Sequence, residues 1–85
     1  MSNAPRVTIE DVNAAIISET YTVLPDGRTT ICQLTLDNGF TVIGESACVS
    51  AENFDAAIGN KYAREAAVSK VWQFLGFRLR DAMPA

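Results

Sequence analysis

The side chains of this 85-residue chain that could do chemistry are cations, carboxylates, aromatic rings and two thiols, because the chain contains no histidine. Nucleophile systems of the Ser-His-Asp and Cys-His types are therefore excluded in their usual form. Cys32 and Cys48 do not form a C-x-x-C pair, so a zinc site would need carboxylates to complete it. The segment from Gly44 to Cys48 begins like a nucleophile elbow but lacks its final glycine. The sequence predicts a protein that is not an enzyme and uses no cofactor and no metal.

Charge is distributed unevenly along the chain. Residues 1–59 carry two cations against eight acids, whereas residues 60–85 carry five cations against two acids. Such a cationic end can hold phosphate groups, and aromatic rings beside it can stack on a base. The predicted ligand-binding residues are Arg28, Lys61, Arg64, Arg78, Arg80, Tyr62 and Phe77. The alternative is that the cations are solvated charges on a helix surface. Trp72 and Phe54 are expected to lie in the core.

The overall balance of the chain limits its partners and location. A net charge of −3 without a long basic stripe argues against binding to duplex nucleic acid. The sequence shows no secretory signal and no apolar run near the roughly 18 residues of a membrane span. Two cysteines are then expected to be free thiols in a reducing compartment. We therefore expect one cytoplasmic domain over residues 1–85, with residues 1–6 as a flexible start and no membrane contact.

The local patterns predict the elements that must position these side chains. Thr8 and Asp11 resemble a capping box at the start of a helix that runs to about Glu19. Residues 20–49 change to a period of two, divided by Pro25-Asp26-Gly27 and Asp37-Asn38-Gly39. Ser50 is expected to cap a second helix that ends at Gly76, followed by an extended tail over residues 77–80. The predicted fold is α+β: a small antiparallel sheet of three or four strands (two hairpins), flanked by an N-terminal helix and a longer C-terminal helix.

The turn geometry sets which side chains share a face of this sheet. A three-residue loop at residues 37–39, with Gly39 in the left-handed region, places Leu34 opposite Val42 and Leu36 opposite Phe40 on an apolar face. A two-residue turn at Asn38-Gly39 is the alternative register. The same loop length in the first hairpin puts four apolar residues on the second face: Tyr21, Val23, Ile31 and Ile43. That face calls for a second helix layer or a partner chain, and a homo-oligomer is expected; cover by the terminal segments is the alternative.

Several blocks of the chain carry a resemblance to known proteins. The run from Leu24 to Cys48, followed by residues 52–55 and 62–65, resembles a family of small tailed-phage proteins, most specifically at residues 38–42 and 44–48. In size and in combining a small antiparallel sheet with helices, the chain is also similar to the Thoeris anti-defence one sponge proteins. The second resemblance implies a non-enzymatic phage protein that sequesters a nucleotide-type ligand, such as a cyclic ADP-ribose isomer, in the infected bacterial cell. The alternative is an inhibitor of a host protein that acts through a protein–protein interface.

Overall fold

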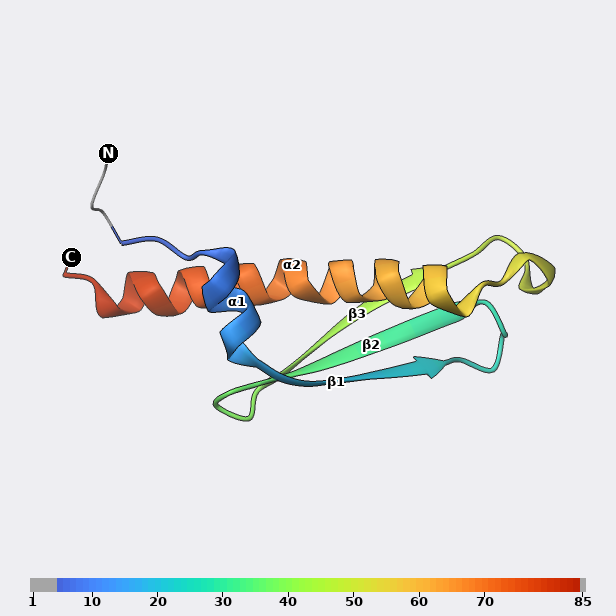
Figure 1. Ribbon diagram of the computed structural model, residues 1–85, viewed down its shortest axis with the longest axis horizontal. Helices are drawn as coiled ribbons and strands as arrows, with labels where there is room; N and C mark the ends of the chain where they lie inside the picture. The colour runs from blue at the N-terminus through green and yellow to red at the C-terminus, as the bar shows by residue number, and fades with distance from the viewer. Residues whose placement is uncertain (1–4, 85) are drawn as a thin grey trace.

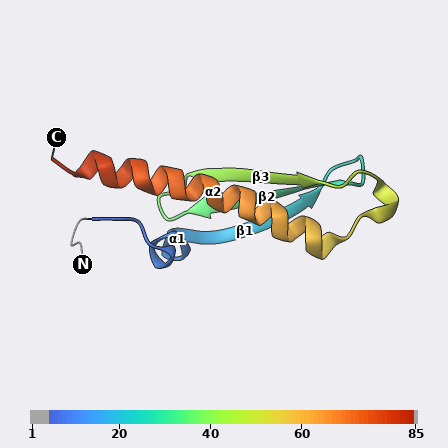
Figure 2. The ribbon, with the colours of Figure 1, turned by 90° about the horizontal axis from the view of Figure 1, so that it is seen from above.

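A computed structural model describes residues 5–84 as three antiparallel strands and two helices (Figure 1). The elements are α1 (Ile9–Ala15), β1 (Ile16–Val23), β2 (Thr29–Leu36), β3 (Thr41–Ala47), a 3-10 turn (Ala51–Asn53) and α2 (Ala56–Ala82). The sheet order is β1-β2-β3, and α2 crosses one face of the sheet obliquely (Figure 2). This arrangement confirms the predicted α+β fold. Most of the predicted flexible start, residues 1–6, lies outside the described residues.

The first helix begins where the sequence predicts and ends earlier. Thr8 Oγ1 accepts a hydrogen bond from the Asp11 amide at 3.2 Å, and the Asp11 carboxylate accepts from the Thr8 amide at 2.9 Å. The helix stops at Ala15 rather than at Glu19, because β1 begins at once with Ile16 and pairs with the end of β2. Strand pairing of a β-branched segment thus outweighs continuation of the helix.

The second hairpin has the predicted bulged register. The Leu36 amide donates to Phe40 O at 2.8 Å, and Leu34 lies opposite Val42. Gly39 has φ +88°, a conformation that a residue with a Cβ rarely adopts. The three-residue loop is therefore confirmed over the two-residue alternative.

The first hairpin differs from the prediction by one residue. Its loop has four residues, because the Leu24 amide donates to Thr29 O at 2.9 Å and Arg28 belongs to the turn. The Asp26 carboxylate accepts bonds from the Thr29 hydroxyl and from the Arg28 and Thr29 amides, and these bonds lower its pKa. A slip of one residue turns every side chain of a strand to the other face. Tyr21 therefore lies on the α2 side of the sheet.

The corrected register changes the composition of the open face. Tyr21 and Val23 pair with Cys32 and Thr30 on the α2 side, so the prediction that they share a face with Ile31 was wrong. The open face carries mainly polar side chains: Ser18, Thr20, Thr22, Gln33, Thr35, Thr41 and Glu45. Two apolar side chains, Ile31 and Ile43, lie among them. Neither helix covers this face (Figure 1). An antiparallel sheet with one polar side can leave that side in water.

The second helix is displaced toward the C-terminus relative to the prediction. It begins after Asp55, whose carboxylate accepts from the Ala57 and Ile58 amides at 2.9 and 3.2 Å; Ser50 instead precedes the 3-10 turn. It continues through Gly76 to Ala82, so the predicted extended tail over residues 77–80 was wrong. Half-buried Leu79 continues the spacing of buried Leu75, and this apolar spacing keeps the segment helical.

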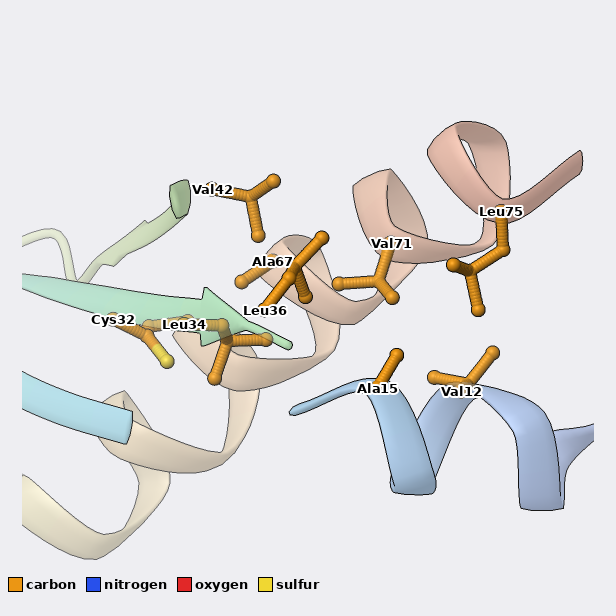
Figure 3. Close-up of a cluster of buried hydrophobic side chains, with 10 residues drawn as sticks. Val12, Ala15, Cys32, Leu34, Leu36, Val42, Ala67, Val71 and Leu75 are labelled. Atoms are coloured by element: carbon orange, nitrogen blue, oxygen red, sulfur yellow. The ribbon is translucent and has the colours of Figure 1, made fainter. Parts of the chain in front are cut away.

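The core lies between α2 and the sheet and changes in size along the helix. The residues that face the sheet recur every four positions and increase in size from a glycine through two alanines to a valine and a leucine: Gly59, Ala63, Ala67, Val71 and Leu75. At the narrow end, Gly44 of β3 meets the helix backbone at Ala63 and Ala67. At the wide end, Val12 and Ala15 of α1 point toward Leu75 and help to fill the space (Figure 3). The helix therefore diverges from the sheet toward its C-terminus.

One buried hydroxyl lies at the narrow end of this core. Thr30 is fully buried, and its Oγ1 has no hydrogen-bond partner among the described residues. An unpaired buried polar group costs free energy, whereas a methyl group of the same shape does not. We expect Thr30→Val to raise the free energy of unfolding by about 1 kcal/mol, measured by urea denaturation. Thr35→Val on the open face is the control, and equal effects of the two substitutions would contradict the assignment.

Candidate functional site

The described residues show no constellation of metal ligands. No group of three or more Cys, Asp or Glu side chains within residues 5–84 comes together as a metal site requires. The Cys32 thiol is buried, and burial raises its pKa. Cys48 is half-buried and its Sγ donates to Ser50 O at 3.1 Å. Burial and a local hydrogen bond thus account for both thiols without a catalytic role.

The seven predicted ligand-binding residues lie in two groups at opposite ends of α2. Arg28 lies in the β1–β2 loop, near the first turns of α2 that carry Lys61, Tyr62 and Arg64. The other group occupies the last turns: Phe77, Arg78 and Arg80. The helical rise separates Tyr62 from Arg78 by roughly 24 Å. One chain therefore does not bring all seven residues to a single ligand.

At the first end, Arg28 and Tyr62 line the same small cavity, which has a volume of about 100 Å³. The Arg28 guanidinium donates to Cys48 O at 3.2 Å and lies 3.9 Å from the Asp26 carboxylate. The Lys61 ammonium lies 5.5 Å from the centre of the Tyr62 ring. Sites for small organic ligands usually have volumes of at least about 300 Å³. Within one chain this cavity is too small for a nucleotide.

Arg64 is engaged with β1. Its Nε donates to Glu19 Oε2 at 3.0 Å, and the Tyr21 hydroxyl donates to the same oxygen at 2.6 Å. The bond from Tyr21 lowers the pKa of Glu19 and Arg64 lowers it further, while partial burial opposes them. Burial and the bond to Glu19 raise the pKa of Tyr21. These contacts tie α2 to β1 and already occupy the Arg64 guanidinium.

At the second end, three phenylalanines form an open groove between α2 and the β2–β3 turn. This aromatic groove consists of Phe40, Phe74 and Phe77 with the surrounding residues Leu36, Asn38, Gln73, Arg78 and Asp81. Its volume is about 610 Å³, within the range of ligand pockets. The Phe40 and Phe74 rings meet edge to face at 5.2 Å between centroids. The Phe77 side chain is 73% exposed, so the groove presents a large apolar group to solvent.

The fold itself creates this groove. The taper of the core lifts the end of α2 away from the sheet, and the last turns extend past the strand ends beside α1 (Figure 2). The molecule is consequently elongated, with a radius of gyration of 15.5 Å where a compact chain of this length has roughly 12 Å. The lifted helix leaves Phe74 and Phe77 without a covering layer. Arg78 bridges to Asp37 at 3.5 Å on the rim of the groove, and Arg80 is exposed.

Sequence reasoning found part of this groove. Phe77 and Arg78 were predicted as ligand contacts, but Phe40 was assigned to the buried face with Leu36. The register of Phe40 was right, yet its ring lies beyond the strand end and is 52% exposed. Trp72 was expected in the core and is exposed on the other flank of α2, whereas Phe54 is half-buried. Phe74 and Phe77 are three positions apart and so share one flank of α2, and this spacing is the sequence signal that could have indicated the groove.

Fold and groove together define a small α+β protein: a three-stranded meander that carries one long helix with an aromatic groove beside the end of that helix. A family model described as phage protein (N4 Gp49/phage Sf6 gene 66) matches residues 7–83, and the chain belongs to this family. The predicted resemblance to a phage protein family is thereby confirmed. No curated protein and no solved structure gives a significant match to the chain. No helix within the described residues is long and apolar enough to cross a membrane.

Proposed function

We propose that this phage protein is a non-enzymatic binding protein that engages a protein of the infected bacterium through the aromatic groove. The observation that carries the proposal is the exposure of three neighbouring rings, Phe40, Phe74 and Phe77, at the end of α2. Exposed apolar patches rimmed by polar residues are typical of interaction sites. Aromatic anchors of this kind supply most of the binding free energy at protein interfaces. The protein would act in the bacterial cytoplasm.

The charges around the groove favour a particular kind of partner. Asp37 and Asp81 lie beside it, and among the described residues Arg78 is the only cation that lines it; Arg78 already pairs with Asp37. Together, Asp37, Asp81 and Arg78 therefore give the rim a net charge of −1. A fitting partner segment has apolar side chains that enter between the phenylalanines and a basic residue that meets Asp81. An amphipathic helix with a basic edge has this chemistry.

Sequestration of a cyclic nucleotide, such as a cyclic ADP-ribose isomer, is the second candidate. It is favoured by the presence in one groove of an aromatic ring, an arginine and two amides: Phe77, Arg78, Asn38 and Gln73. A ring can stack on a base, amides can bond to its edge, and arginine can pair with a phosphate. The charge of the rim argues against this candidate, because a ligand with two phosphates would face Asp37 and Asp81 with a single, already paired arginine.

A photo-crosslinking experiment tests the first candidate. The photoreactive residue p-benzoylphenylalanine is introduced at Phe77 or, as a control, at Ile58, which is also exposed on α2 but lies at its other end. Irradiation of infected bacteria is expected to link position 77, and not position 58, to one bacterial protein. Phe77→Asp is then expected to weaken binding of that purified protein at least about 30-fold, because an anchoring aromatic contributes about 2 kcal/mol or more.

The opposing outcomes are equally definite. Adducts only between copies of this chain, or equal labelling from both positions, would contradict a host-protein partner. Calorimetric titration with cyclic ADP-ribose isomers separates the second candidate from the first. Binding that Arg78→Ala weakens at least about tenfold and that Arg80→Ala leaves unchanged would favour the nucleotide.

A further inference from the structure

The two edges of the sheet differ in how their backbone groups are protected. In a three-stranded sheet, the outer strands β1 and β3 each present unpaired N–H and C=O groups along one side. Proteins usually blunt such edges with a lysine, a proline or a covering segment. Only one of the two edges in the described residues has a lysine in this role.

The β3 edge is protected by α2. Lys70 reaches from the helix and donates a hydrogen bond to the carbonyl of Ile43. This carbonyl points away from β2, because β2 and β3 exchange their bonds through the alternate pairs that include Leu34 and Val42. A second strand that approached β3 would have to displace the ammonium group. This edge is therefore blocked.

The β1 edge has no such protection. Because Leu24 bonds to Thr29 across the hairpin and antiparallel bonding alternates, Glu19, Tyr21 and Val23 direct their backbone N–H and C=O groups outward. No other described residue bonds to these groups. The strand is eight residues long and contains no lysine and no proline. It is thus a free edge along which another strand can pair.

We propose that the β1 edges of two copies of this chain pair antiparallel around a two-fold axis at Tyr21, which makes one six-stranded sheet. In this register Tyr21 lies opposite Tyr21 of the second copy, and Glu19 lies opposite Val23. The three residue pairs make six backbone hydrogen bonds, two for each pair, since both partners of each pair direct their groups outward. The two α2 helices lie on the same side of the joined sheet, because the axis is perpendicular to it.

The side chains of β1 suit a second copy better than an unrelated strand. Glu19 is the one charged residue of β1, and Arg64 pairs with it at 3.0 Å within the chain. The proposed register places each Glu19 opposite a valine, so like charges do not meet. On the open face, Thr20 lies opposite Thr22 of the second copy, a cross-strand pair that is favourable in sheets. Pairing also shields Tyr21 and Val23, which are both exposed in the single chain.

Amide hydrogen exchange on the unmodified protein tests this inference. In a dimer of this kind, the amides of Glu19, Tyr21 and Val23 are expected to exchange at least about tenfold more slowly than those of Ile43 and Glu45. Both groups of amides point outward in the single chain, so the comparison isolates the second copy. Sedimentation equilibrium over the same concentrations is expected to show twice the 9.2 kDa chain mass.

Matched proline substitutions provide the complementary test. Tyr21→Pro and Glu45→Pro each remove an outward N–H that makes no bond within the chain, one on each edge. Tyr21→Pro is expected to give a monomer with an unchanged circular dichroism spectrum, and Glu45→Pro to remain a dimer. A 9.2 kDa species at all concentrations of the unmodified protein, or a dimer whose β1 amides exchange as fast as those of β3, overturns the inference. Neither result affects the aromatic groove, so the proposed function is tested separately.

Discussion

Gly44→Val is expected to cost at least about 3 kcal/mol of the free energy of unfolding. Gly44 lies where β3 and α2 come closest, and a Cβ there would overlap backbone atoms of Ala63 and Ala67 and lie 2.8 Å from the carbonyl carbon of Ala66. Backbone atoms cannot rotate away as a side chain can, so the whole helix would have to move. A domain of this size has a total stability of roughly 4–13 kcal/mol.

Urea denaturation followed by circular dichroism measures this effect. Gly76→Ala is the matched control, because Gly76 lies inside the same helix and a Cβ there meets no atom of the described residues within 4 Å. Alanine at this position is expected to raise the free energy of unfolding by up to about 1 kcal/mol through helix propensity. A Gly44→Val variant within about 1 kcal/mol of the unmodified protein would contradict the close approach of helix and sheet.

Leu34→Ala is expected to cost about 2–5 kcal/mol. Leu34 is fully buried in β2, opposite Val42, and its truncation leaves a cavity beneath α2 (Figure 3). For a chain of this size, each kcal/mol lowers the melting temperature by about 4–8 °C. Thermal unfolding followed by circular dichroism measures the shift.

Leu24→Ala is the control for this cavity effect. Leu24 lies at the end of the first hairpin and is 36% exposed, so the same change of side chain creates no enclosed cavity there. A loss below about 1 kcal/mol is expected for it. Similar losses for the two leucines would show that the core is not centred on β2.

The elements governed by local interactions could be predicted from the sequence. The capping box at Thr8 and Asp11 depends on two side chains three positions apart. The second hairpin depends on Gly39, which adopts φ +88° at little cost, and on the apolar alternation that fits only one register. In both cases the contacts that determine the structure join residues close together in the sequence. The order of the elements and the α+β class could therefore be predicted.

The candidate site was less predictable because it depends on contacts between distant segments. Whether Arg28 belonged to a strand or to a turn decided the face on which Tyr21 lies, and the hydrogen bonds of Asp26 made it a turn residue. The separation of Arg28 from Arg78 follows from the uninterrupted length of α2. Propensity alone placed the end of this helix at Gly76.

The sequence by itself determined the class of fold, the second hairpin and the absence of histidine chemistry, because these depend on residue type and short-range spacing. Tertiary structure decided where the functional surfaces lie. The gradient from Gly59 to Leu75 lifts one end of α2, and this lift exposes Phe74 and Phe77 as the wall of a groove. Lys70 of α2 blocks the β3 edge of the sheet, whereas no described residue bonds to the outward backbone groups of β1. Such outcomes depend on how a helix and a sheet fit together, which no short-range pattern specifies.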